Sequence, residues 1–235
     1  DLGAFAKEQG LGGLAYLKVT DAGVDSPLAK FLTAAELDAL KISLPAPWKT
    51  GDVVFFAADK PKKARAALGQ VRLKLGHRLG LIPAGKYHWS WIKDFPLFQW
   101  NEDDKRWDSE HHPFTSPHPD DAAKLGNDNG NIRSLSYDLV LNGNELASGS
   151  IRIHDPEMQQ KIFDTIGLAP EESKARFGFM LKAFEYGPPP HGGAAIGIDR
   201  LLTILLGRES IRDVIAFPKT QKAVCPMTDA PSPVD

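Results

Sequence analysis

Two acidic residues, Asp138 and Glu145, flank the dipeptide Asn142-Gly143 in the 235-residue chain. Asn-Gly is typical of a two-residue hairpin turn, and this turn predicts antiparallel strands with Asp138 opposite Ala147. Alternate residues of a strand share a face, so we expect both carboxylates on one side of the sheet. Such a pair suits Mg²⁺ that bridges substrate phosphates. The alternative interpretation is two solvated surface carboxylates.

A third charged residue, Arg152, joins this face only if the second strand is irregular. Ile151 and Ile153 have the opposite parity to Leu146, so a strict strand would place these isoleucines on the carboxylate side. A β-bulge at Ser148-Gly149-Ser150 restores the apolar pattern and turns Arg152 toward the acidic pair. There Arg152 would either hold a carboxylate bidentately or neutralise the two acids, and both interpretations stay open.

A run of small residues, His191 to Ile198, precedes Asp199-Arg200 and an apolar helix that ends at Gly207. A strand of this kind presents no bulk, which suits a flat group such as a purine lying close to the backbone. Arg200 near the helix start could hold a phosphate with the help of free amides. The Gly-x₄-Gly-Lys-[Ser/Thr] loop is absent. Tight packing of helix against sheet is the alternative explanation.

The histidines do not predict a metal centre. His111 and His112 are adjacent, so on a strand they would point to opposite faces, and no His-Glu-x-x-His helix exists. A metal interpretation would also draw on His118, His154 and His191. We expect imidazoles that meet an anionic substrate or serve a structural role. Cys225 has no evident base partner, so we interpret it as a structural thiol.

Residues 1 to about 80 predict a small α+β unit. Leu14 to Val19 and Val53 to Phe56 are strand candidates, the second apolar enough to be buried on both faces. Thr33 and Glu36 form a capping box. A long helix begins near Asp59 and Pro61, with one apolar stripe, and Pro83-Ala84-Gly85 marks the boundary. The stripe consists of Ala64, Leu68, Val71, Leu75 and Leu79.

The remainder also mixes strands and helices. Tyr87, Trp89 and Trp91 alternate on a predicted strand whose rings should fill a core, although an aromatic stretch could also stack bases. Residues 117–131 are polar and predict a loop. Two helices follow, starting at Asp155-Pro156 and at Pro170. The fold class is therefore α+β.

Composition narrows the class of protein further. Lys and Arg number 28 against 30 Asp and Glu, a net charge of -2, so any polynucleotide contact must be local. A single cysteine excludes a disulfide framework. No apolar run approaches the roughly 18 residues of a membrane span, and the start is no signal peptide. We expect a soluble, cytoplasmic protein.

Several stretches together resemble the catalytic core of bacterial-type aspartyl-tRNA synthetases. The resemblance covers essentially the whole chain, in order. The stretches are His111-His112-Pro113-Phe114-Thr115-Ser116-Pro117, Tyr137-Asp138 through Asn142-Gly143-Asn144-Glu145, Gly149-Ser150-Ile151-Arg152-Ile153-His154, His191-Gly192-Gly193 through Gly197-Ile198-Asp199-Arg200-Leu201, Ile215-Ala216-Phe217-Pro218-Lys219 and Met227-Thr228-Asp229-Ala230-Pro231-Ser232. Pro226 departs from the apolar residue expected there.

The resemblance implies a domain organisation. Residues 1–82 would be a GAD-type insertion domain, incomplete at its N-terminus, and residues 83–235 the second half of a class II antiparallel catalytic domain, including motif 3. The family carries an anticodon-binding domain, the motif 1 dimer helix and motif 2 before this region. We therefore expect a fragment that is inactive alone, from a parent that is a homodimer through motif 1.

The resemblance also implies roles for single residues in aspartate–tRNA ligation. Arg152, His111 and His112 would bind L-aspartate. Asp138 and Glu145 would hold Mg²⁺ on ATP. Glu145, Gly197, Ile198, Asp199 and Arg200 would line the ATP site, with Arg200, Glu145 and Arg152 as the catalytic set. The substrates would be ATP, L-aspartate and tRNA(Asp), with tRNA(Asn) also possible.

Two alternative functions remain. A related class II enzyme for asparagine or lysine fits the insertion domain and the His-His-Pro-Phe-Thr-Ser-Pro stretch less well. A catalytically idle tRNA-binding or regulatory paralogue would not need Asp138, Glu145, Arg152 and Arg200 together.

Overall fold

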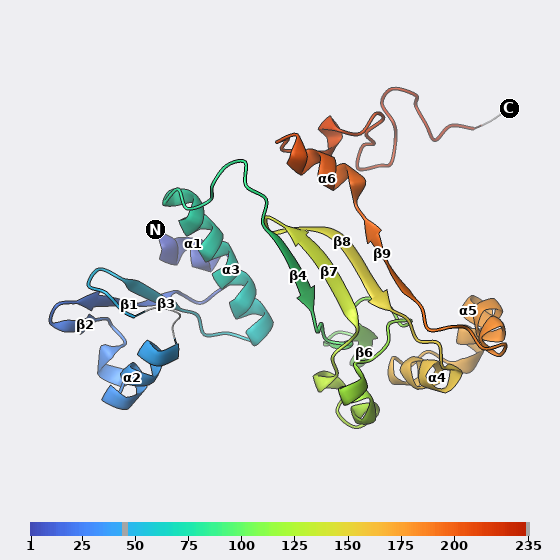
Figure 1. The fold of residues 1–235 in the computed structure, drawn as a ribbon, viewed down its shortest axis with the longest axis horizontal. Coiled ribbons are helices and arrows are strands. Elements are labelled where there is room, and N and C mark those ends of the chain that lie inside the picture. The colour runs from blue at the N-terminus through green and yellow to red at the C-terminus, as the bar shows by residue number, and fades with distance from the viewer. Residues whose placement is uncertain (44–46, 234–235) are drawn as a thin grey trace. The chain divides into compact units, whose positions relative to one another are not determined.

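The computed structural model describes residues 1–43 and 47–233. Their backbone divides into two compact units, Asp1–Lys86 and Tyr87–Asp235. Each unit combines helices with antiparallel strands, as the α+β prediction requires (Figure 1). No helix in the described ranges is both long and apolar enough to span a membrane.

The first unit is built on a three-stranded antiparallel sheet in the order β2-β1-β3. Its first and last helices pack through a small apolar core of Ala6, Leu11, Ala67 and Val71. The elements are α1 (Leu2–Glu8), β1 (Ala15–Thr20), β2 (Gly23–Asp25), the 3₁₀ helix η1 (Ala29–Phe31), α2 (Ala34–Ser43), β3 (Val53–Phe56) and α3 (Pro61–Arg78).

Local signals in this unit mostly predict the observed elements. The capping box is confirmed, because Thr33 N donates to Glu36 Oε2 at 2.8 Å and Glu36 N donates to Thr33 Oγ1 at 3.3 Å. The prediction that β3 is buried on both faces is wrong: β3 is an edge strand, and Val53 is 43% exposed. The apolar stripe of α3 is also incomplete, since Leu79 is 62% exposed.

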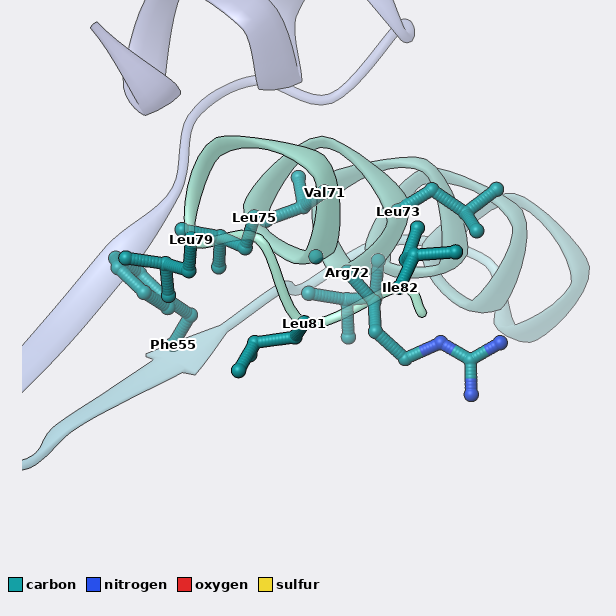
Figure 2. Close-up of a pocket in the computed structure, with 10 residues that line it drawn as sticks. Phe55, Val71, Arg72, Leu73, Leu75, Leu79, Leu81 and Ile82 are labelled. Atoms are coloured by element: carbon teal, nitrogen blue, oxygen red, sulfur yellow. The ribbon is translucent and has the colours of Figure 1, made fainter. Parts of the chain in front are cut away.

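Beside α3 lies an open apolar groove of about 600 Å³ (Figure 2). Apart from the Arg72 side chain it offers no group that could perform chemistry, so it is not a candidate active site. Its lining residues are Phe55, Leu68, Val71, Arg72, Leu73, Leu75, Gly76, Leu79, Leu81 and Ile82.

The second unit is organised around a four-stranded antiparallel sheet in the order β4-β7-β8-β9. In Figure 1, α4 and α5 lie beyond one end of β9 and α6 beyond the other. The elements are β4 (Trp89–Lys93), β5 (Phe98–Asn101), β6 (Arg106–Ser109), the 3₁₀ helices η2 (Pro119–Lys124) and η3 (Asn129–Asn131), β7 (Ser136–Leu141), β8 (Asn144–Ile151), α4 (Pro156–Thr165), α5 (Pro170–Phe184), β9 (Gly192–Ile196), α6 (Ile198–Leu205) and the 3₁₀ helix η4 (Ile211–Asp213).

Two predictions for this unit need correction. Trp89 and Trp91 do not fill a core: they are 50% and 58% exposed, although Leu141, the strand partner of Trp89, is fully buried. The segment 117–131 is not a plain loop either, since it contains η2 and η3.

Asp121 anchors this polar segment. It is only 3% exposed, and its two carboxylate oxygens each lie 2.7 Å from a cation, Lys124 Nζ and Arg133 Nε. The hydrogen bond from Arg133, followed by that from Lys124, holds the pKa of Asp121 well below its usual range. These ion pairs on one buried carboxylate order a stretch whose composition alone predicts a loop.

Candidate functional site

The β7–β8 hairpin places the two acidic residues on one face. Asn142 and Gly143 form the turn with φ of 50° and 80°, as predicted for Asn-Gly. Val140 pairs with Glu145, and Asp138 pairs with Ser148 rather than with the predicted Ala147. Opposed residues of an antiparallel pair point to the same side, so Glu145 shares a face with Val140. Val140 is two residues from Asp138 on the same strand, so the two carboxylates also share that face.

The bulge that aligns this hairpin lies earlier than predicted. The register shifts opposite Leu139 and Val140, which makes Leu146 the extra residue, whereas Ser148 to Ser150 pair regularly. The predicted consequence nevertheless holds, because any single insertion between Glu145 and Arg152 reverses the parity of the strand. Arg152 is therefore on the face of the two acids.

This face is elongated. At a rise of roughly 3.3 Å per residue, Glu145 is about 7 Å along the sheet from Asp138, while Arg152 is about 13 Å from it in the other direction. The acids therefore occupy one end and the guanidinium the other, a separation that suits a substrate with phosphates at one end and a carboxylate at the other. We call this surface the acid–arginine face: Asp138, Glu145, Ser148, Ser150 and Arg152 with the β9 residues opposite them.

Asp138 has an unsatisfied oxygen. Its Oδ1 is buried and has no hydrogen-bond partner in the part of the chain that the structure describes. A buried unpaired carboxylate oxygen is costly and calls for a cation or a donor. The described residues contain no cluster of three metal-binding side chains. Two carboxylates suit a Mg²⁺ ion that takes its remaining ligands from water and substrate phosphates, so the donor set fits that ion.

The stretch 111–117 lies against the arginine end of the face. Thr115 forms a bridge with Arg152, and Phe114 O accepts from Ile153 N at 3.0 Å. From α4, the fully buried Gln159 donates through Nε2 to Pro113 O at 2.8 Å. The backbone that carries the paired histidines is therefore fixed from two sides.

Arg152 and His112 are in direct contact. The guanidinium Nη1 lies 3.0 Å from His112 Nδ1 and also contacts Nε2. Burial, followed by the charge of Arg152, lowers the pKa of His112 to about 4, so this imidazole is neutral at pH 7. No carboxylate among the described residues pairs with Arg152. The guanidinium consequently keeps its full charge and can receive an external carboxylate.

His111 is positioned separately from His112. Its ring packs edge-on against Phe95 with centroids 4.9 Å apart, and its Nδ1 lies 3.4 Å from Ser136 Oγ. A cavity of about 380 Å³ opens beside both histidines, lined also by residues of β6, α5 and the α4–α5 connection. Arg152 does not line that cavity, so it is not the same space as the acid–arginine face.

The sequence left two explanations for the small residues of this region, close packing or room for a flat ligand, and the glycines of β8 and β9 include examples of each. A Cβ at Gly149 would lie 2.1 Å from Gly193 O, and one at Gly192 would lie 2.9 Å from Ser150 O, so these two glycines serve close strand packing. A Cβ at Gly193 would meet nothing within 4 Å. Gly193 faces the same side as its partner Ser150, so β9 offers the acid–arginine face an open, flat floor.

The start of α6 is attached to the bulge. Gly197 N donates to Leu146 O at 2.7 Å, and the Arg200 guanidinium donates to Glu145 O. Both carbonyls belong to the bulged segment of β8, and residues 197–200 donate to them. Arg200 thus lies next to Glu145 although the two residues are 55 positions apart. Ile198 and Asp199 form the exposed first turn of the helix.

The other candidate residues lie away from this face or have structural contacts. His191 O accepts from Arg152 N at 2.9 Å, which helps to hold Arg152, while His191 Nδ1 lies 2.9 Å from Pro189 O. His118 caps η2 and His154 is exposed. Cys225 is buried, and a hydrogen bond with Thr228 lowers its pKa.

The sequence analysis did not predict the contacts that Gln159 and Tyr137 make. Tyr137 lies across Gly149 and donates through its hydroxyl to Gly193 O at 3.1 Å, which ties β7 to β9 across β8. Gln159 was detectable in principle, since it is a polar residue three positions before Ile162 on the buried side of α4. For Tyr137 no local pattern reveals the partner strand.

Comparisons with known proteins identify the family of the chain. A family model described as tRNA synthetases class II (D, K and N) matches residues 13–221. The chain is 50% identical over 235 residues to the aspartate–tRNA(Asp/Asn) ligase of Geotalea uraniireducens, covering 100% of this chain and 39% of that protein. It is also 50% identical over 230 residues to the enzyme of the same name from Nitratidesulfovibrio vulgaris, covering 98% of this chain and 37% of that protein.

A solved structure of an aspartyl-tRNA synthetase from Entamoeba histolytica also matches. Its sequence identity is 27% and its TM-score 0.46, over 67% of this chain and 27% of that chain. The chain thus spans about two fifths of the length of the curated relatives that it matches.

Proposed function

Because the chain belongs to the class II tRNA synthetases of the D, K and N type, we propose that it is part of an aspartate–tRNA ligase. The observation that carries this proposal is the acid–arginine face, where a charged Arg152 without a carboxylate partner shares one sheet surface with Asp138 and Glu145. Identity of 50% to proteins named aspartate–tRNA(Asp/Asn) ligase supports the choice of amino acid.

The reaction would proceed in two steps. The α-carboxylate of L-aspartate, already ionised at pH 7, attacks the α-phosphorus of ATP and displaces pyrophosphate, so this step needs no protein base. A terminal hydroxyl of the tRNA then attacks the carbonyl of the aspartyl-adenylate and releases AMP. The protein contributes positioning and stabilisation of negative charge.

The amino-acid end of the site would consist of Arg152, His111 and His112. Arg152 would bind the side-chain carboxylate of aspartate, and neutral His112 would orient the guanidinium without neutralising it. Asparagine would leave that half-buried charge without a partner, which disfavours it by several kcal/mol, on the order of 2–5 once the bound substrate covers the guanidinium.

The nucleotide end would consist of Glu145 and residues 197–200. Gly197, Ile198 and the flat floor at Gly193 would receive the purine and ribose, with Asp199 at the rim of the site. Arg200 would hold the terminal phosphates. Asp138 and Glu145 would hold Mg²⁺, which, when bound, neutralises charge on the ATP phosphates.

Domain roles and partners complete the proposal. Residues 1–82 would form a GAD-type insertion and residues 83–235 the half of the catalytic domain that contains motif 3. The longer protein would act in the cytoplasm as a homodimer. It would charge tRNA(Asp), and the names of the relatives make tRNA(Asn) a second acceptor to test.

Aspartate-dependent exchange of pyrophosphate into ATP tests the proposal. It should be measured in a longer protein that carries this chain at the length of its relatives. We expect activity with aspartate and not with asparagine or lysine, and a loss of at least about 100-fold in Glu145→Ala and Arg200→Ala with folding intact. Wild-type rates in both variants would reject the assigned roles. Binding of an aspartyl-adenylate analogue without exchange would instead indicate a catalytically idle paralogue.

A further inference from the structure

The two units carry opposite net charges, which the value of -2 for the whole chain conceals. Residues 1–86 contain 13 Lys and Arg against 8 Asp and Glu, a net charge of +5. Residues 87–235 contain the other 15 Lys and Arg and the other 22 Asp and Glu, a net charge of -7. The positive charge of the first unit is therefore a local property that needs its own explanation.

One helix accounts for the net positive charge of this unit. The 18 residues of α3 include six Lys and Arg and no Asp or Glu. They are Lys62, Lys63, Arg65, Arg72, Lys74 and Arg78. Like charges four residues apart, such as Lys74 and Arg78, destabilise an isolated helix by a few tenths of a kcal/mol. A solvated surface helix normally carries acidic residues among its basic ones. Here the acid that pairs with Lys63 is Asp59, which lies just before the helix, with its Oδ2 2.7 Å from Lys63 Nζ.

Arg65 and Arg72 form the uncompensated part of this surface. They are seven residues apart, two turns of the helix, and so lie on the same side. Both are exposed, and neither pairs with a carboxylate among the described residues. Figure 2 shows the Arg72 guanidinium extending away from the leucines of the apolar groove. Both charges are therefore available to an external anion.

Gly69 lies between these arginines on the same side of the helix. A Cβ at this position would meet nothing within 4 Å, so packing within the unit does not require glycine there. Glycine in a helix interior costs about 1 kcal/mol relative to alanine. The absence of a side chain at Gly69 leaves a shallow strip of helix surface between the two arginines, where a chain of phosphates can approach the helix backbone closely.

We propose that α3 binds the phosphate backbone of duplex RNA through Arg65 and Arg72 across Gly69. The proposal deepens the proposed function, since it assigns part of the RNA contact of a tRNA ligase to the first unit. Residues 61–78 contain no Phe, Tyr or Trp, and the one imidazole, His77, lies beyond the Arg65–Arg72 segment, so the contact would be made to phosphates and would be independent of sequence.

The test uses the 235-residue chain and a fluorescein-labelled RNA hairpin with a 12-base-pair stem. Anisotropy titrations between 50 and 200 mM NaCl give the affinity and its salt dependence. We expect Arg65→Glu/Arg72→Glu to weaken binding at least tenfold at 100 mM NaCl. The slope of log K against log salt should become shallower by about 2, since each lost phosphate contact removes about 0.9. Arg65→Gln/Arg72→Gln should show the same change in slope.

The control is Lys30→Glu/Lys41→Glu, which changes the charge of the same unit equally at two exposed lysines outside α3. We expect it to weaken binding less than threefold. Equal losses in both double variants, or an unchanged affinity in the arginine variant, would overturn the proposal, as would binding to phosphatidylserine vesicles without binding to the hairpin. The assay contains no ATP or aspartate, so it stays informative whether or not the longer protein shows aspartate-dependent exchange.

Discussion

Gly149 provides the sharpest structural test of the acid–arginine face, because its replacement by alanine would collide with two neighbouring strands. The added Cβ would lie 2.1 Å from Gly193 O and 2.9 Å from Ala194 Cα, both backbone atoms of β9, and 2.7 Å from Tyr137 Cε2. A ring can turn slightly, but a paired backbone can yield only if the strand moves. Gly149→Ala should therefore force β9 away from β8.

The size of the effect follows from this geometry. Overpacking a close-packed site costs about 1–3 kcal/mol, and a clash with backbone belongs at the upper end of that range. At about 1.4 kcal/mol per factor of ten, a cost of 3 kcal/mol raises the equilibrium constant for local opening of the β8–β9 pair roughly 100-fold. Hydrogen exchange of the β9 amides reports that opening directly.

The measurement compares amide exchange in the wild-type chain, in Gly149→Ala and in Gly193→Ala. The last variant is the matched control, since it adds the same methyl group one strand away, at a position with nothing within 4 Å. We expect protection of residues 192–196 to fall about 100-fold in Gly149→Ala and to stay within about threefold of wild type in Gly193→Ala. Unchanged β9 protection in Gly149→Ala would refute the assigned strand packing.

Four further predictions concern single residues. In the longer protein, Gly193→Ala should raise the KM for ATP at least about tenfold without loss of folding, because the methyl group fills the open floor; an unchanged KM would remove Gly193 from the nucleotide site. In the same protein, Arg152→Gln should raise the KM for aspartate at least about 100-fold in steady-state exchange kinetics and leave the KM for ATP unchanged. Arg152→Lys should not bring the KM for aspartate back to the wild-type value, because an ammonium group cannot bind a carboxylate bidentately. The folded chain keeps His112 neutral, so unfolding takes up a proton between pH 6.5 and about 4. The contribution of His112 to the free energy of unfolding is therefore present above pH 6.5 and lost as the pH falls through this window. In denaturant titrations at several pH values, His112→Gln should flatten the dependence of the free energy of unfolding on pH between 6.5 and about 4. Thr33→Ala should destabilise the first unit by about 1 kcal/mol and Thr33→Ser by much less, measured by thermal unfolding.

The features predictable from the sequence are those set by neighbouring residues. The Asn142-Gly143 turn, the capping box at Thr33 and the start of α4 at Asp155-Pro156 all depend on contacts within four positions. A single sequence carries such signals in full. The candidate site was predictable to the same degree, because the parity of Asp138, Glu145 and Arg152 is a property of one hairpin with one inserted residue.

Features that depend on distant partners were misplaced or missed. The predicted bulge falls at Ser148 to Ser150, where glycine and serines suggest irregularity, but those residues must stay regular to pair with β9. The exposure of Trp89 and Trp91 has a similar origin: their apolar rings predict a core, but the described residues leave 50% and 58% of these side chains exposed. In both cases the deciding neighbour lies far away along the chain.

The position of the bulge determines which part of the chain contacts it. It falls at Leu146, at the acidic end of the face, where the carbonyls of Glu145 and Leu146 accept hydrogen bonds from the Arg200 guanidinium and from Gly197 N. A bulge at Ser148 to Ser150 would have produced the same parity for Arg152, but the irregular residue would then lie away from the contacts with the start of α6. The observed insertion therefore turns Arg152 to the side of the acids and lies beside the carbonyl that holds Arg200. Both arginines thus depend on the same irregular residue, so deletion of Leu146 should remove Arg152 and Arg200 from the face together.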